Sequence, residues 1–112
     1  MAPRNVFEVV SLKFIFNKCG RTEWSKEDFV REELNKYLNI YASNTSLKYC
    51  CALLEEGAFV VAADFSKEIS FITVVKILDQ MYSCTGHMLS IEYEERKRMV
   101  TVSVSCWTTK RC

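Results

Sequence analysis

The sequence has three glycines, one histidine and almost no net charge. The glycines all fall in expected turns, so no glycine-rich loop is present that could hold a phosphate. A single histidine argues against a structural zinc site, which usually needs two pairs of ligands. A formal net charge of +1 gives no reason to expect broad electrostatic binding to nucleic acid or to membranes.

Long apolar runs are also missing. No segment approaches the roughly 20 residues that a membrane-spanning helix needs, so we expect no membrane partner. Residues 1–20 carry charges throughout and lack the shape of a signal peptide. We therefore expect an intracellular protein of the nucleus or cytoplasm, in which the six cysteines are free thiols rather than disulfides.

The composition is that of an ordinary folded protein, with 49% hydrophobic and 26% charged residues. At 112 residues the chain can build a single core but not two. No internal repeat or linker divides it. We expect one α+β domain over residues 1–112, with a loose tail at 1–5 and a short basic tail at 108–112.

Apolar periodicity predicts the elements. Alternation typical of strands occurs at 6–16, 47–53, 59–65, 89–93 and 100–106. Ser25 begins a first predicted helix that ends near residues 40–43. Ser66 is the predicted N-cap of a second helix, which Gly86 closes. That helix is rich in β-branched residues, so burial must stabilise it.

The order βαββαβ with one added strand predicts a ferredoxin-like antiparallel sheet with both helices on one face. The Thr/Ser face of the last strand suits an exposed surface, and we place that strand at a sheet edge. The opposite face, with Val9, Ile15 and either Val60 or Val61, would stay open. An open apolar face is usually covered by a second copy or by another protein.

The sequence gives less support to a catalytic or a metal-binding function than to an interaction surface. Cys84 and His87 have the spacing of a chelating pair or of a Cys–His dyad, to which Cys50, Cys51, Cys106 or Cys112 could add ligands. A helix C-terminal turn explains the pair more simply, and Cys50 and Cys51 must face opposite ways on a strand. Glu55, Glu56 and Asp64 are candidate acid–base carboxylates, but a solvated turn and a strand end explain them. We expect no cofactor and no enzyme activity.

Arg96, Lys97 and Arg98 form a basic end together with Lys110 and Arg111. This end and a nearby aromatic residue, Tyr93 or Trp107, could contact nucleic acid by stacking on bases. The aromatic signature of an RNA-recognition sheet is missing from the third predicted strand. A charged turn that keeps a sheet edge soluble is the competing explanation.

Three short segments carry a family resemblance: Ser11-Leu12-Lys13, Leu54-Glu55-Glu56-Gly57-Ala58-Phe59 and Met88-Leu89-Ser90-Ile91-Glu92-Tyr93. They resemble, in the same order over residues 10–108, the third-open-reading-frame proteins of adenovirus early region 4. The resemblance implies a non-enzymatic viral early protein that forms dimers through its sheet. It also implies nuclear assemblies that trap antiviral and DNA-damage-response proteins of the host.

Carried over to this chain, the resemblance places an assembly surface at 81–84 and in the C-terminal tail. The chain departs from the family at Ser83, where an assembly-critical Asn is expected, and in its basic tail. The residues predicted for self-association are Val9, Ile15, Met81, Tyr82, Ser83, Cys84, Val102 and Val104. A fainter likeness to the protein subunits of ribonuclease P implies the alternative, an RNA-binding or ribonucleoprotein subunit.

Overall fold

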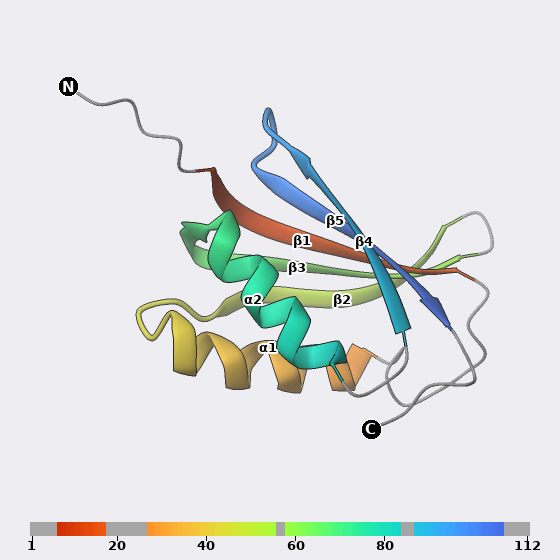
Figure 1. Ribbon diagram of the computed structural model, residues 1–112, viewed down its shortest axis with the longest axis horizontal. Coiled ribbons are helices and arrows are strands. Elements are labelled where there is room, and N and C mark those ends of the chain that lie inside the picture. Colours follow the sequence, from red (N-terminus) through yellow and green to blue (C-terminus); the bar gives the residue numbers. More distant parts are fainter. Residues whose placement is uncertain (1–6, 18–26, 56–57, 84–86, 107–112) are drawn as a thin grey trace.

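The computed structural model describes residues 7–17, 27–55, 58–83 and 87–106. In chain order the elements are β1 (Glu8–Asn17), α1 (Glu27–Tyr41), β2 (Leu47–Glu55), β3 (Ala58–Ser70), α2 (Phe71–Tyr82), β4 (His87–Glu94) and β5 (Met99–Cys106). The protein is therefore α+β, as predicted, with two helices and one sheet (Figure 1). The predicted cap at Ser25, the turn at Gly86 and both predicted tails lie outside the described residues.

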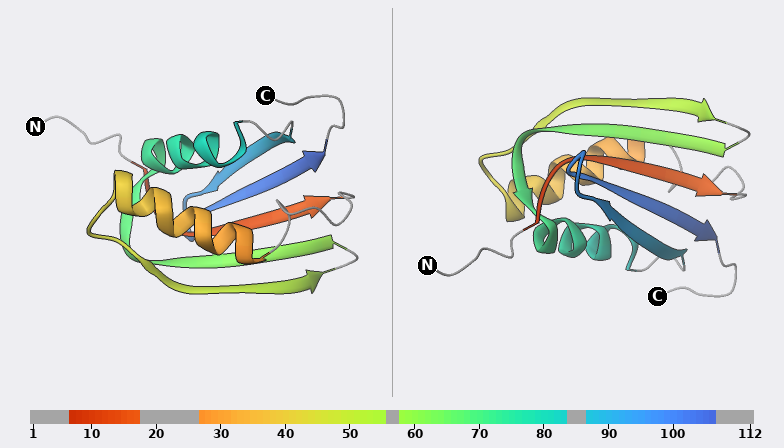
Figure 2. Two further views of the ribbon diagram at one scale, coloured as in Figure 1. Left: turned by 90° about the horizontal axis from the view of Figure 1, so that it is seen from below. Right: turned by 90° about the horizontal axis from the view of Figure 1, so that it is seen from above.

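The sheet has five strands in the order β2-β3-β1-β5-β4, and both helices lie on the same face of it (Figure 2). Neighbouring strands are antiparallel except β1 and β5, which are parallel. The prediction of a wholly antiparallel sheet is therefore wrong. Strands β4 and β5 form an antiparallel hairpin, so only one of them can run antiparallel to β1. That strand is β4, but β5, which runs parallel to β1, is the one that lies beside it.

Strand β5 lies inside the sheet and not at its edge, contrary to the prediction. Val100, Val102 and Val104 are 0% exposed beneath the helices, whereas the helix-facing residues of β4 are only half-buried. Placing β5 beside β1 buries its valines completely, which favours that arrangement over the predicted one. The edge position falls to β4.

The register of β1 breaks near its start. Val9 pairs with Ile69, but Ser11 pairs with Asp64, five residues earlier on β3. Beyond the break the alternation shifts, so that Val9 and Leu12 are both buried on the helix side. The expectation that Val9 lies on the open face is therefore wrong, because a bulge inserts a residue that alternation alone does not reveal.

Helix α2 begins four residues later than predicted. Its N-cap is Ser70, whose Oγ accepts a hydrogen bond from the Thr73 amide at 3.2 Å. Ser66 instead lies within β3 and accepts a hydrogen bond from the Ser46 amide. Strand β3 continues through Ile69 and Ser70 because β1 pairs with both of these residues. This placement also puts Ile69, a β-branched residue, in a strand, where its propensity is favourable.

The core lies between the helices and the sheet. Strand β1 contributes the central apolar row Leu12, Phe14 and Phe16, whose side chains are 3% exposed or less. Fully buried helix residues pack on this row: Val30, Leu34 and Leu38 from α1, and Val74, Ile77 and Leu78 from α2. With both helices on this side, no described helix covers the opposite face. None of the helices in the described ranges is long and apolar enough to cross a membrane.

Candidate interaction surface

The face turned away from the helices carries an apolar row. Paired residues of adjacent strands share a face, so the register places Leu53, Val60 and Ile15 side by side. Leu53 is 44% exposed and Ile15 is half-buried. Tyr49, two rows along on β2, is 52% exposed. No described helix lies over this face in the right-hand view of Figure 2. We call this part of the sheet, formed by β2, β3 and β1, the apolar half of the open face.

An ion pair crosses the apolar half. Along β3, Val60 lies between Ala58, which pairs with Glu55 of β2, and Ala62, which pairs with Lys13 of β1. The Lys13 Nζ and Glu55 Oε1 atoms are nevertheless only 3.2 Å apart. The aliphatic stem of the lysine must therefore pass over Val60. This explains why Val60 is only 1% exposed although no described helix covers it. Lysine stems commonly cover apolar surface while the ammonium group reaches solvent.

The other half of the open face is rich in hydroxyl groups. Strand β5 presents Thr101, Ser103 and Ser105, and its register places Ser90 of β4 beside Ser103. Glu92 lies beside Thr101 at the outer edge. The open face is thus divided into an apolar half and a polar half that ends in carboxylates.

Most residues predicted for self-association lie elsewhere. Ile15 is on the open face, as expected. Buried on the helix side are Val9, Met81, Tyr82, Val102 and Val104. In this conformation these side chains cannot form a contact surface, because the helices or the sheet cover them. Ser83 is exposed at the end of α2, and Cys84 lies outside the described residues.

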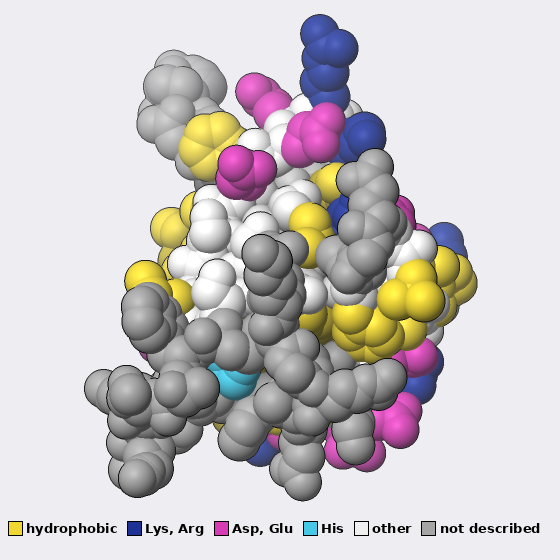
Figure 3. All heavy atoms as spheres, turned by 90° about the vertical axis from the view of Figure 1, so that its right-hand side faces the viewer, with side chains coloured by type: hydrophobic (Ala, Val, Ile, Leu, Met, Phe, Trp, Pro, Cys, Tyr) yellow, Lys and Arg dark blue, Asp and Glu magenta, His cyan; other side chains and the backbone are white. Residues whose placement is uncertain are grey.

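The sequence alone did not predict that Leu53, Tyr49 and Lys13 lie on the open face. Both alternating sets of residues 47–54 are largely apolar, so alternation cannot decide which set faces the helices. Pairing with β3 decides it: Leu53 lies beside Val60, whereas Leu54 lies beside Phe59 on the helix side. Leu54 extends past the core there and is 81% exposed. Figure 3 looks onto this end of the molecule and shows a group of hydrophobic side chains at its right-hand side.

The basic turn after β4 is partly neutralised. Arg98 is paired with Glu68 of β3, and Lys97 lies 4.0 Å from Glu94. Arg98 also has a positive φ of 52°, a conformation that this tight turn imposes. Its guanidinium is held against β3, which leaves Arg96 as the arginine of the turn without an ion pair to a described residue. Nucleic-acid binding by this turn stays a prediction.

Tyr93 is not placed as an exposed stacking platform. Its ring packs edge-on against Phe7 at 5.3 Å and Phe71 at 5.7 Å, and its hydroxyl donates to the Glu8 carbonyl at 2.9 Å. These contacts fix the start of β1 to β4 beside the first residue of α2. Trp107, the other aromatic candidate, lies outside the described residues.

His87 begins β4 and packs edge-on against Tyr82, with ring centroids 5.7 Å apart. It is visible at the molecular surface in Figure 3. Loss of solvent around the imidazole lowers the pKa of His87 below its usual value. Its predicted metal partner Cys84 lies outside the described residues. Within the ranges that the structure describes, no three His, Cys, Asp or Glu side chains are grouped to hold a metal ion.

The remaining reactive residues are dispersed. Cys50 and Cys51 are free thiols on opposite faces of β2. Burial raises the pKa of Cys50, although nearby Arg31 opposes this; such a shift disfavours the nucleophilic thiolate. Tyr49 contacts the Cys51 Sγ at 2.8 Å, and this hydrogen bond raises the pKa of Tyr49. Glu55 is paired with Lys13, and Asp64 is exposed on β3.

Comparisons of the chain with family models, with curated proteins and with solved structures found no match. The candidate interaction surface is an open sheet face with an apolar half, which the Lys13–Glu55 ion pair crosses, and a polar half.

Proposed function

We propose that this chain is a non-enzymatic interaction protein that self-associates, as a dimer or a larger assembly, through the open face. The observation that supports this most is that Leu53 and Tyr49 are exposed, and Ile15 half-buried, on a face that no described helix covers. The resemblance to the adenovirus early region 4 family extends the proposal to a viral protein in the host cell. Its further partners would then be regulatory or antiviral proteins of the host nucleus.

The size of the open face supports a second copy as its cover. Five strands about 4.8 Å apart, with about eight residues each at about 3.3 Å per residue, span roughly 24 by 26 Å. This is about 600 Å² per partner, close to the roughly 800 Å² that each partner contributes to a standard interface. Stacking two such faces would approach the size of a stable dimer interface.

The division of the face suits a two-fold arrangement. In a symmetric dimer the same patch contacts itself, so apolar half can pack on apolar half. Glu92 and Glu94 at the far edge would then lie at the rim, where charged groups stay hydrated. The Lys13–Glu55 pair, which is charge-neutral, and Asp64 of β3 would be the ionic groups within the apolar half.

We also infer that the part of the chain from β1 to α2 is a ferredoxin-like unit. The order β2-β3-β1 with two helices on one face supports this. The β4–β5 hairpin then completes the sheet, with β5 in the place beside β1.

The test compares two substitutions on the same face. Leu53→Asp places a charge in the apolar half, whereas Ser90→Asp, the control, places one in the polar half. Both positions are exposed, so neither change should unfold the monomer. We expect Leu53→Asp to weaken self-association at least tenfold in light scattering at several concentrations, and Ser90→Asp to leave it within about twofold. Equal effects of the two variants would contradict the apolar half as the part of the open face that forms the contact.

A further inference from the structure

The two edge strands of the sheet differ in how they are protected. Strand β2 carries Lys48 and has a register break between Leu47 and Tyr49. In addition, Arg31 of α1 donates a hydrogen bond to the Cys50 carbonyl at 2.8 Å. Lysine side chains, irregular register and cover from a helix are the means by which proteins prevent an edge strand from pairing with another chain. The β2 edge has all three.

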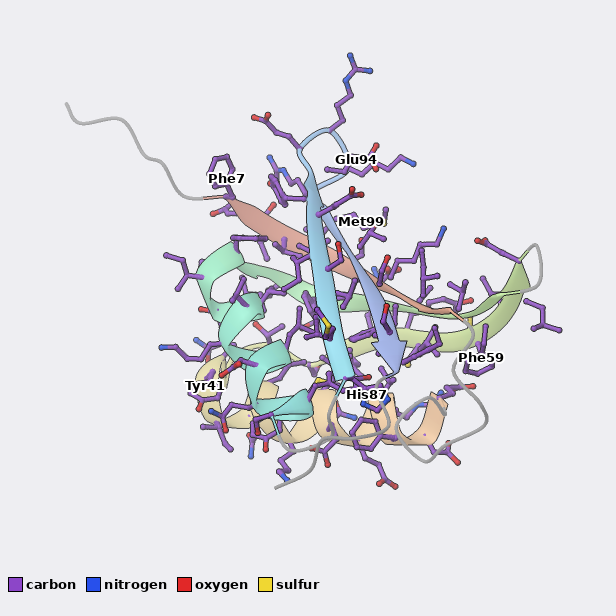
Figure 4. All side chains as sticks on the ribbon, turned by 45° about the vertical axis from the view of Figure 1, so that its right-hand side comes forward. Phe7, Tyr41, Phe59, His87, Glu94 and Met99 are labelled. Carbon is purple, nitrogen blue, oxygen red and sulfur yellow. The ribbon has the colours of Figure 1, made fainter. Side chains whose placement is uncertain are left out.

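The β4 edge has none of these features along its length. Its register with β5 is regular from His87 to Glu94, and its sequence contains no Lys, Arg or Pro. Figure 1 looks onto this edge, and no described helix or strand lies in front of it. Figure 4 shows the same strand from His87 to Glu94 at the front of the molecule. Regular, uncovered edges are templates for an added strand.

On its helix side, β4 borders a groove. Because α2 packs over β1 and β3, a space of about 290 Å³ separates it from β4, lined by Val75, Asp79, Tyr82, His87, Leu89 and Ile91. Val75, Leu89 and Ile91 are half-buried and give the groove an apolar lining. Asp79 is exposed at its wall and forms no ion pair with a described residue.

On its open side, β4 borders a second hollow of about 430 Å³, formed by Glu92, Tyr93, Glu94 and Thr101. Glu92 is exposed and has no ion pair with a described residue. Glu94 is paired only at 4.0 Å, with Lys97. The strand therefore has a hollow on each side, and both contain a carboxylate.

We propose that the outer edge of β4 binds an extended, basic segment of a partner protein as a sixth strand. Side chains of an added strand alternate between the two faces. Those on the helix side would enter the apolar groove beside Leu89 and Ile91, within reach of Asp79. Those on the open side would lie beside Glu92. The segment that fits alternates apolar residues with arginine or lysine.

Charge favours this occupant over a second copy of β4. A second β4 would bring its own Glu92 and Glu94 to the edge and no Lys or Arg, whereas the basic residues of the added segment would neutralise Glu92 and Glu94 on the open side. The inference rests on the proposed function, because it names the kind of partner that the interaction protein binds. It uses an edge of the sheet, and so leaves the open face available for the dimer.

The probe is a nine-residue peptide that alternates valine with arginine, and its control has glutamate in place of arginine. We expect the arginine peptide to shift the amide NMR signals of residues 87–94 and to leave those of 47–55 unchanged. Glu92→Lys combined with Glu94→Lys should weaken binding about tenfold or more, since both carboxylates that face the arginines on the open side are reversed. The matched double variant Glu32→Lys with Asp64→Lys changes two exposed carboxylates elsewhere and should change affinity less than about twofold.

Equal binding of the two peptides, shifts at 47–55, or no shift at millimolar peptide would overturn the inference. A β4 edge already protected from hydrogen exchange by a second copy would do so as well. The solution mass is measured on the same samples. A monomer that binds the arginine peptide at β4 contradicts the dimer but supports this inference, and a dimer that does not bind it contradicts this inference alone.

Discussion

The Nζ atom of Lys13 lies 3.2 Å from the Oε1 atom of Glu55, and the row between these two residues contains Val60. Both charged side chains are partly exposed, 30% and 47%. Solvent screening then limits the ion pair itself to less than about 1 kcal/mol. The larger contribution is expected from the lysine stem, which keeps Val60 out of water.

This relationship predicts different effects for two Lys13 substitutions. Lys13→Met keeps an unbranched apolar stem over Val60, so the free energy of unfolding should change by less than about 0.5 kcal/mol. Lys13→Ala uncovers Val60 and should lower it by about 1 kcal/mol. Urea unfolding of the two variants at the same protein concentration is the measurement. An equal loss for both would show that the charge, and not the stem, stabilises this region.

The placement of Val102 in the core predicts how it responds to a charge. Val102 is 0% exposed, so Val102→Asp should prevent folding, because a buried carboxylate without a partner costs several kcal/mol. Ser105→Asp, on an exposed position of the same strand, should fold normally. Circular dichroism during heating distinguishes these outcomes. A folded, merely dissociated Val102→Asp protein would instead place Val102 in an interface, as the sequence alone suggested.

The cap of α2 gives a third prediction. Ser70→Ala removes the acceptor of the Thr73 amide and should lower the free energy of unfolding by about 1 kcal/mol. Ser70→Asp retains an acceptor and should be within a few tenths of a kcal/mol of the unmodified protein. Chemical denaturation measures both. If alanine and aspartate at this position are equally stable, Ser70 is not the functional cap.

The single histidine predicts a pH dependence. Burial lowers the pKa of His87 in the folded state, so the unfolded chain binds the proton more readily. Stability from this residue is therefore present above the unfolded pKa of about 6.5 and is lost as the pH falls through the lower folded pKa. His87→Gln should lose less stability than the unmodified protein between pH 7.5 and 5.5. Equal losses in thermal unfolding would mean that other groups cause the decline.

The local patterns were predictable from the sequence where one short segment determined them. The alternation of Val10, Leu12, Phe14 and Phe16 predicted the apolar row of β1, of which the last three are buried and Val10, at the register break, is only half-buried. The α+β class and the element order were confirmed. Helix α1 ends at Tyr41, within the predicted range. Each of these features follows from the spacing of apolar residues within one segment, without reference to the rest of the chain.

Features that depend on distant pairing were not predictable. Ser66 and Ser70 are equally good caps by residue type, and the pairing of Ser70 with Glu8 decides between them. The break at Val9 depends likewise on where β3 meets β1. Either β4 or β5 could have paired with β1, and the alternation within each strand does not show which of them does. The sequence therefore predicted an open face with apolar residues, but of the residues named for it Val9 is buried on the helix side and Leu53 was not foreseen.

The most direct test of the account is the solution mass of the reduced, unmodified protein, measured by light scattering at several micromolar concentrations. The open face predicts a dimer or a larger assembly, because its apolar half would otherwise stay in water. A mass of 13.0 kDa, that of the monomer, throughout the series would contradict self-association through this face. RNA binding would then be the next activity to measure.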